Sequence, residues 1–150
     1  MLVKFRLNGE EVEVEARPNE ILLDTLRLKL NVRSVKRGCE KGECGACTIL
    51  LNGDPVTSCL ILTPQVEGSE ILTVEGLEED QEFKKLVDSF VSEGAVQCGY
   101  CTPGFLLTAY AALSKGKIRS VDDAKKYLEG NLCRCTGYNK IIKAVVKAVS

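Results

Sequence analysis

The chain has 150 residues, of which 45% are hydrophobic and 27% are charged, a balance typical of a folded globular protein rather than a disordered one. Its 20 basic and 21 acidic residues leave a net charge of −1, which argues against a nucleic-acid-binding protein. No apolar run approaches the ~20 residues of a membrane span, and the N-terminus lacks the apolar core of a secretion signal, so we expect a cytoplasmic protein.

The first half of the chain reads mainly as strands. Apolar and charged residues alternate over 3–7 and again over 12–15, and Asn8-Gly9 between them indicates a hairpin turn. A short helix is predicted over 22–30, where leucines gather on one side.

Further strands are expected beyond a loop rich in glycine and cysteine. Residues 48–62 predict two strands joined at Asn52-Gly53, and residues 71–75 predict a last one. The order strand, strand, helix, strand, strand predicts an α+β domain of β-grasp type over residues 1–75.

From residue 76 the apolar period changes to that of helices. One helix is predicted around residues 83–91, with acidic residues before it that suit the positive end of a helix. A second begins at Thr102 and ends near Gly116, a third runs from Ser120 to Gly130, and a fourth covers 141–149. Ser120 with Asp123 resembles a capping box. Four short helices with short links predict an all-α four-helix bundle over residues 76–150.

The chain contains eight cysteines and no histidine. The missing histidine excludes Ser-His-Asp and Cys-His catalysis, imidazole metal sites and mixed cysteine–histidine zinc fingers. In a reducing cytoplasm, eight cysteines are not expected to form four structural disulfides. Any chemistry of this chain therefore depends on sulfur, and each half carries four of the cysteines.

The first set follows the C-x4-C-x2-C spacing of plant-type 2Fe–2S proteins, with a fourth cysteine downstream. Its loop, RGCEKGECGAC, interleaves glycines that let the backbone wrap a compact core and direct N–H groups at the sulfurs. The fourth ligand is expected on the strand after the Asn52-Gly53 turn. Buried free cysteines, or a redox C-x2-C pair, remain the alternative reading. The predicted ligands are Cys39, Cys44, Cys47 and Cys59.

The second set has a C-x2-C pair and a distant C-x-C pair, a pattern that is less diagnostic by itself. Four thiolates in this spacing suit a 2Fe–2S cluster or a structural zinc ion. Both pairs lie at predicted helix boundaries, where a positive helix end stabilises negative thiolates around either metal centre. The predicted ligands are Cys98, Cys101, Cys133 and Cys135.

The strings CEKGECGAC, QCGYCTPG and NLCRCTGY resemble the iron–sulfur subunit of the molybdenum hydroxylase family, also called the xanthine oxidase family. Its members include aldehyde and xanthine oxidoreductases, carbon monoxide dehydrogenase and hydroxybenzoyl-CoA reductase. The resemblance covers essentially the whole chain and fills all eight ligand positions. It implies a ferredoxin-like N-terminal domain and a four-helix domain that each hold one 2Fe–2S cluster, which favours iron over zinc at the second set.

The resemblance also implies partners and a role. A large subunit would hold molybdopterin beside the second cluster, a medium subunit would hold FAD beyond the first, and the assembly would be a dimer of heterotrimers. Gln97 and Cys135 match the residues that approach the pterin. The chain would relay electrons between the molybdopterin centre and FAD, so no catalytic residue is expected in it.

Two readings from other classes make different predictions. A free ferredoxin-like carrier would be stable without partners, but such carriers usually rely on a one-signed surface charge that this chain lacks. A zinc-binding interaction module would be colourless and would hold zinc in at least one set.

Overall fold

The fold was analysed in a computed structural model that describes residues 1–149. Its five strands form one mixed sheet in the order β2-β1-β5-β3-β4, in which β1 and β5 are parallel and the other pairs are antiparallel. The strands are β1 (Leu2–Leu7), β2 (Glu10–Glu15), β3 (Thr48–Leu51), β4 (Asp54–Thr57) and β5 (Glu70–Leu72).

Both predicted hairpin turns are confirmed. Asn8 and Gly9 have φ values of 51° and 86°, and Asn52 and Gly53 have 51° and 89°. Positive φ at both central residues gives the turn the twist that antiparallel strands require, and Asn-Gly adopts it at low cost. In β1 every second side chain is buried, as its alternating sequence predicts.

The predicted helix over 22–30 is confirmed in place but not in form. An α-helical turn, α1 (Leu22–Asp24), continues directly into a π-helical segment, η1 (Thr25–Lys29). The leucines Leu22, Leu23 and Leu26 are fully buried against the sheet.

Two strand predictions were too long. The segment after β4 is a short 3-10 helix, η2 (Ser58–Leu60), so Cys59 does not lie on a strand as predicted. Likewise β5 ends at Leu72, and Val74–Leu77 forms the 3-10 helix η4. A further 3-10 helix, η3, covers Thr63–Val66. Apolar runs of this length do not distinguish a strand from a buried turn by periodicity alone.

All four predicted helices of the second half are present. They are α2 (Gln81–Ser92), α3 (Thr102–Ser114), α4 (Val121–Leu128) and α5 (Asn139–Val149). Asp80 caps α2 by accepting from the Phe83 N–H at 2.9 Å. Ser120 caps α4, but the Asp123 carboxylate accepts from the N–H of Arg119, so the capping box is only half formed.

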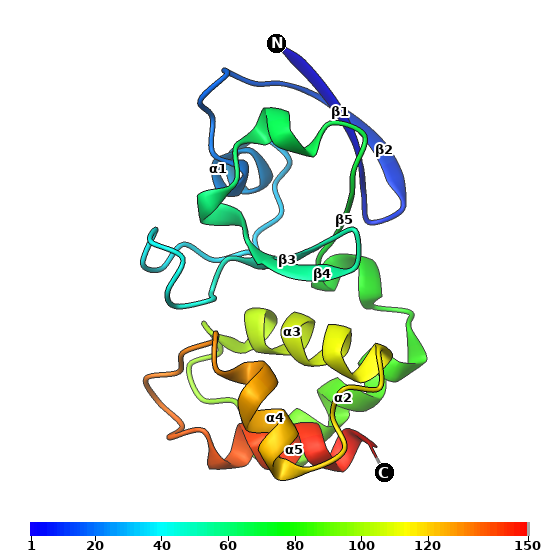
Figure 1. Cartoon of the computed structure of the whole chain (residues 1–150), viewed down its shortest axis with the longest axis vertical. Helices are drawn as coiled ribbons and strands as arrows, with labels where there is room; N and C mark the ends of the chain where they lie inside the picture. Colours follow the sequence, from blue (N-terminus) through cyan, green and yellow to red (C-terminus); the bar gives the residue numbers. More distant parts are fainter. Residues whose placement is uncertain (150) are drawn as a thin grey trace.

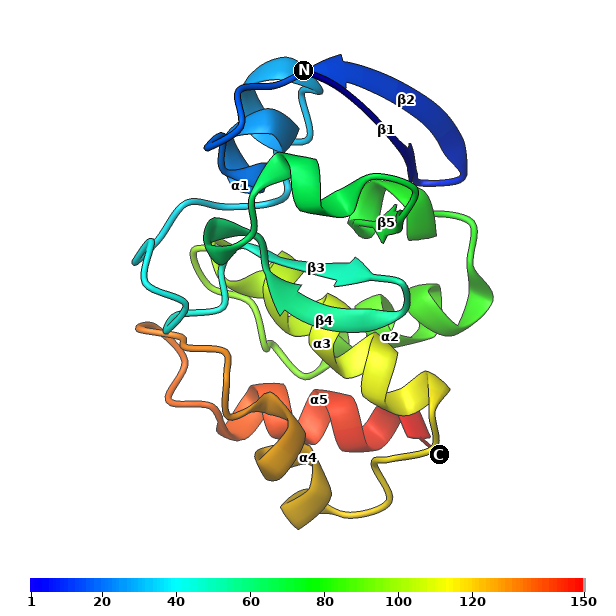
Figure 2. The same ribbon diagram turned by 45° about the horizontal axis from the view of Figure 1, so that its top comes forward.

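Helix α3 connects the two halves of the molecule. It lies between the β3–β4 hairpin and the other helices (Figure 1), and turning the view keeps it directly against the sheet (Figure 2). Its side chains are buried on almost every side, as expected for a helix that is apolar all round.

The buried apolar residues form two clusters. One lies between the sheet and the segments α1 and η1, and the other is formed mainly by the four helices α2, α3, α4 and α5. Leu50 of β3 belongs to the helical cluster, whereas its neighbour Ile49 belongs to the sheet cluster. Within residues 1–149 no helix is both long and apolar enough to cross a membrane.

Candidate metal centres

The first three cysteines of the first set lie on an irregular loop between η1 and β3. Glu40, Gly42 and Gly45 have φ values of 56°, 77° and 75°, so the backbone adopts the left-handed conformation at three points along this loop. Such left-handed positions favour glycine, and they fold the loop around its own sulfur atoms. The fourth cysteine, Cys59, reaches the same place from η2.

Backbone N–H groups converge on the sulfurs of this loop. The Cys39 Sγ accepts from the N–H groups of Lys41, Glu43 and Cys44 at 3.3, 3.2 and 3.3 Å. The Cys44 Sγ accepts from the N–H groups of Cys39 and Ala46, both at 3.4 Å. These donors, Lys41 first, lower the pKa of Cys39 to about 7, because hydrogen bonds to a thiolate favour its charged form.

The other two cysteines of the first set are buried. Cys47 and Cys59 are only 2% and 6% exposed. Burial, followed by the neighbouring Cys47 thiol, raises the pKa of Cys59 to about 11. A thiol that is buried in an apolar place, such as that of Cys59, is a ligand for which a bound cation makes a large difference.

The second set is assembled from two loops of the helical half. Cys98 precedes α3 and Cys101 is its N-cap residue, whereas Cys133 and Cys135 lie between α4 and α5. Burial, followed by the neighbouring Cys133 thiol, raises the pKa of Cys101 to about 12. The pKa of Cys133 lies below its ordinary value. Burial alone would raise it, but hydrogen bonds to the sulfur, those from Thr136 first, outweigh the effect of burial.

Within each set the thiols are arranged as two neighbouring pairs. In the first set Cys39 neighbours Cys44, and Cys47 neighbours Cys59. In the second set Cys101 neighbours Cys133, and Cys98 neighbours Cys135. Over residues 1–149 no three cysteine, aspartate or glutamate side chains converge closely enough to hold a single ion. Two thiol pairs per set suit a two-iron core, in which each iron takes two thiolates.

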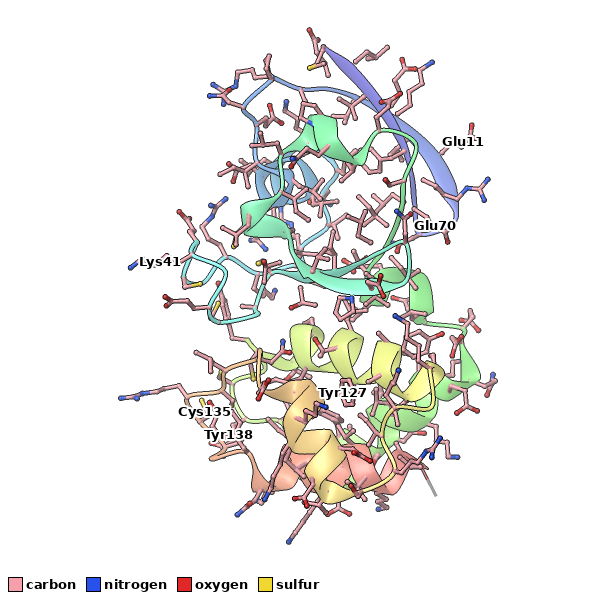
Figure 3. The ribbon with its side chains drawn as sticks, viewed as in Figure 1. Glu11, Lys41, Glu70, Tyr127, Cys135 and Tyr138 are labelled. Carbon is pink, nitrogen blue, oxygen red and sulfur yellow. The ribbon has the colours of Figure 1, made fainter. Side chains whose placement is uncertain are left out.

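Both sets lie on the same side of the molecule. The loop around Lys41 and the loop around Cys135 approach each other at one edge in both orientations of the ribbon, and Figure 3 labels both residues there. The remaining predicted site residue, Gln97, is exposed next to Cys98, and Cys135 is exposed as well. Exposed side chains at this edge are accessible to a partner.

Sequence reasoning missed several residues that contact these cysteines or the loops that carry them. The Thr136 hydroxyl donates to the Cys133 Sγ at 3.1 Å, and the Tyr138 hydroxyl accepts from the Cys133 N–H at the same distance. Asn131 donates from its side chain to the carbonyl of Gly45 in the other loop. The only sequence signal for them is their position next to the C-x-C pair in NLCRCTGY.

Two family models match the chain. Residues 5–84 match a 2Fe–2S iron–sulfur cluster binding domain, and residues 73–146 match a 2Fe–2S binding domain. Together they include every predicted cysteine ligand.

Curated relatives match along almost the whole chain. A nicotinate dehydrogenase small FeS subunit from Eubacterium barkeri is 50% identical over 98% of this chain and 94% of its own length. A xanthine dehydrogenase iron–sulfur-binding subunit from Escherichia coli O157:H7 is 39% identical over 96% of this chain and 91% of its own length.

Solved structures share the fold. A chain of quinoline 2-oxidoreductase from Pseudomonas putida 86 superposes with a TM-score of 0.94 at 43% identity, over 99% of this chain and 93% of that one. The aldehyde oxidoreductase from Desulfovibrio desulfuricans superposes with a TM-score of 0.91 at 37% identity, over 99% of this chain but 17% of that one. The mixed sheet with its helices is therefore a 2Fe–2S ferredoxin-like arrangement.

Proposed function

The chain belongs to the iron–sulfur subunits of the molybdenum hydroxylase family, and from this premise we propose that it relays electrons between a molybdopterin centre and FAD held by partner subunits. An electron-transfer role in a multi-subunit oxidoreductase follows from the family. The path through two clusters between the molybdopterin centre and FAD is the proposed part.

The proposed ligands are the eight cysteines in their two sets. Cys39, Cys44, Cys47 and Cys59 would hold one 2Fe–2S cluster, and Cys98, Cys101, Cys133 and Cys135 would hold the other. When bound, each cluster carries one electron at a time. A hydroxylation at molybdenum releases two electrons, which the clusters would pass singly between molybdenum and the flavin.

The chain's own residues would control the environment of these clusters. The N–H groups that point at Cys39 and Cys44 would stabilise negative charge on the sulfurs, and the burial of Cys47 and Cys59 would exclude water from the other end of the set. Electron transfer needs no general base, and the absence of histidine from the chain agrees with this role.

The proposal also assigns the two surfaces at the cysteine edge. Gln97 and Cys135, both exposed, would face the pterin edge of the molybdenum subunit. The first set, farther from them along the chain, would face the FAD subunit. The observation that carries the relay is the adjacency of the two cysteine loops at one side of the molecule.

The finer organisation is part of the same proposal. We divide the chain into a β-grasp domain over 1–75 and a four-helix bundle over 76–150, a division supported by the two apolar clusters. The subunit would join a large molybdopterin subunit and a medium FAD subunit in a dimer of heterotrimers. A cytoplasmic location would keep the thiols reduced for cluster binding.

Anaerobic purification with any companion proteins tests the proposal. Iron, acid-labile sulfide, zinc, molybdenum and flavin would be assayed, and EPR spectra recorded after reduction with dithionite. We expect about four irons and about four sulfides per chain, two distinct EPR signals, and molybdenum and flavin in larger companions.

Other results would overturn specific parts. About two irons with one zinc would remove the second cluster and with it the relay. Two full clusters in a chain that migrates alone from native extract would favour the free carrier.

A further inference from the structure

Two hydrogen bonds join the two cysteine loops. The N–H of Leu132, the residue before Cys133, donates to the carbonyl of Cys44 at 2.9 Å. The side chain of its neighbour Asn131 donates to the carbonyl of Gly45 at 3.2 Å. Leu132 and Asn131 lie one and two residues before Cys133, and the carbonyls that they contact belong to Cys44 and to its neighbour Gly45. We call these contacts the seam.

The seam is buried and tightly packed at Asn131. Asn131 is 4% exposed. A Cβ added to Gly45 would lie 2.6 Å from both the Asn131 Nδ2 and the Gly130 carbonyl oxygen, and a Cβ added to Gly104 would lie 2.4 Å from the Gly45 carbonyl oxygen. Real Cβ atoms essentially never approach so closely, so Gly45 lets the first loop lie directly against the second, and Gly104 lets α3 lie against the first.

Asn131 is not needed to satisfy the carbonyl that it contacts. Thr48 already donates to the Gly45 carbonyl through its N–H at 3.2 Å and its hydroxyl at 2.6 Å. A buried amide costs free energy unless it is paired, so an apolar residue would be the simpler filler of this position. What Asn131 adds is a link between loops 86 residues apart in sequence.

A further hydrogen bond, at an exposed residue, also joins the two loops. The hydroxyl of Tyr100, between Cys98 and Cys101, donates to the carbonyl of Arg37, two residues before Cys39. The seam therefore continues from the interior to the exposed edge, where Tyr100 is 49% exposed.

We propose that the seam fixes the separation of the two cluster positions, with Asn131 as the positioning residue that sets the rate of electron exchange between them. The inference rests on the proposed relay. In the exchange, one electron would pass between a reduced cluster held by one set and an oxidised cluster held by the other, so that one is oxidised as the other is reduced. Its rate depends steeply on the gap, and the bonded connection from Cys133 through Leu132 to Cys44 crosses that gap with a single hydrogen bond.

The test uses the cluster-loaded full chain in its native complex and the variant Asn131→Leu, which keeps the branched shape but cannot donate. Ser89→Ala is the matched control, because it also removes one buried side-chain-to-backbone bond, from Ser89 to Ala144, but within the helical half alone. The readouts are iron and sulfide content and the magnetic splitting between the two reduced clusters in low-temperature EPR. Splitting falls as the clusters separate.

We expect Asn131→Leu to keep both clusters but to show a smaller splitting and slower electron exchange, whereas Ser89→Ala keeps the wild-type splitting. Wild-type splitting in Asn131→Leu, or the same decrease in Ser89→Ala, would overturn the inference.

If Asn131→Leu fails to hold its iron, Tyr100→Phe decides, because Tyr100 is exposed and its loss removes only one seam bond. A smaller splitting in Tyr100→Phe supports the seam, and an unchanged one overturns it. A wild-type chain without two clusters would instead overturn the proposed function, and the inference with it.

Discussion

Thr136 makes two contacts with one sulfur. Its N–H and its hydroxyl donate to the Cys133 Sγ at 3.4 and 3.1 Å. Among the described cysteines, Cys133 is the one that receives a side-chain hydroxyl bond. A hydroxyl donor can be removed by substitution, unlike the backbone donors around Cys39, so the second set offers a direct test of how this chain tunes a cluster.

We predict that Thr136→Val lowers the midpoint potential of the second cluster. Reduction adds negative charge, so a donor to sulfur stabilises the reduced form more than the oxidised form. A difference of about 1 kcal/mol corresponds to about 40 mV for one electron. Redox titration followed by EPR measures the shift, and Thr136→Ser should retain the wild-type potential. An unchanged potential in Thr136→Val would show that the N–H bond alone sets it.

Glu20 is a buried carboxylate held by several donors. It is 6% exposed, and it accepts from Lys29 Nζ at 2.8 Å and from the Thr25 hydroxyl at 2.6 Å. Lys29, then Thr25, lower the pKa of Glu20 to about 2, although burial opposes the shift. Lys29 and Arg17 are the charged groups nearest to it.

This lowered pKa predicts an acid-dependent loss of stability. Because the folded pKa lies below the unfolded one, the stabilisation by Glu20 is complete above about pH 4.5 and is lost as the pH falls towards 2. Glu20→Gln should lower the free energy of unfolding by about 1–3 kcal/mol at neutral pH, and the difference from wild type should shrink below about pH 4.5. Urea unfolding at several pH values measures it. Glu11→Gln, at an exposed carboxylate, serves as the control, and a pH-independent difference would contradict the assignment.

Among the secondary-structure elements, local chemistry predicted the turns and helices well. Asn-Gly turns and the 3.6-residue period of α2 and α5 act over a few residues, so the sequence is enough to locate them. The π-helical segment η1 and the 3-10 helix η2 were missed. Both lie where tertiary packing of buried leucines, or of Cys59, overrides the local preference.

In the loop around the first set, position 45 requires glycine for two separate reasons, a positive φ and a lack of room for a Cβ atom. Gly45 has a φ of 75° and has no room for a Cβ beside the Gly130 carbonyl. Gly68 has nearly the same φ, 73°, but nothing within 4 Å of its added Cβ. Comparing alanine substitutions at Gly45 and Gly68 therefore distinguishes the cost of backbone strain, which both share, from the cost of a steric clash, which only Gly45 has.

We predict that Gly68→Ala lowers the free energy of unfolding by about 1 kcal/mol and keeps all iron. Gly45→Ala should cost roughly 2–4 kcal/mol, since overpacking adds to the same strain, and should reduce the iron bound by the first set. Urea midpoints and iron content check both. Equal costs would mean that the loop can open at the seam without penalty.

At the scale of the whole molecule, sequence reasoning reached its limit. It predicted the two halves, but not that α3 lies on β3, that β1 pairs in parallel with β5, or that Asn131 contacts Gly45. These are contacts between residues far apart in sequence, which no local period or turn signal encodes. The ligand assignments of all eight cysteines stay predictions until iron is measured.

Adjacent residues of β3 face different cores, and this predicts how the halves depend on each other. Leu50 is 3% exposed and packs with the helices, whereas Ile49 is fully buried with the sheet and α1. Leu50→Ala should therefore reduce the hydrogen-exchange protection of α3 as well as β3, by about 2–4 kcal/mol. Ile49→Ala should have a similar cost in the sheet but a smaller one in α3. Hydrogen exchange on the cluster-loaded chain measures both. If α3 kept its protection in Leu50→Ala, the stability of the helical half would not depend on this contact with the sheet.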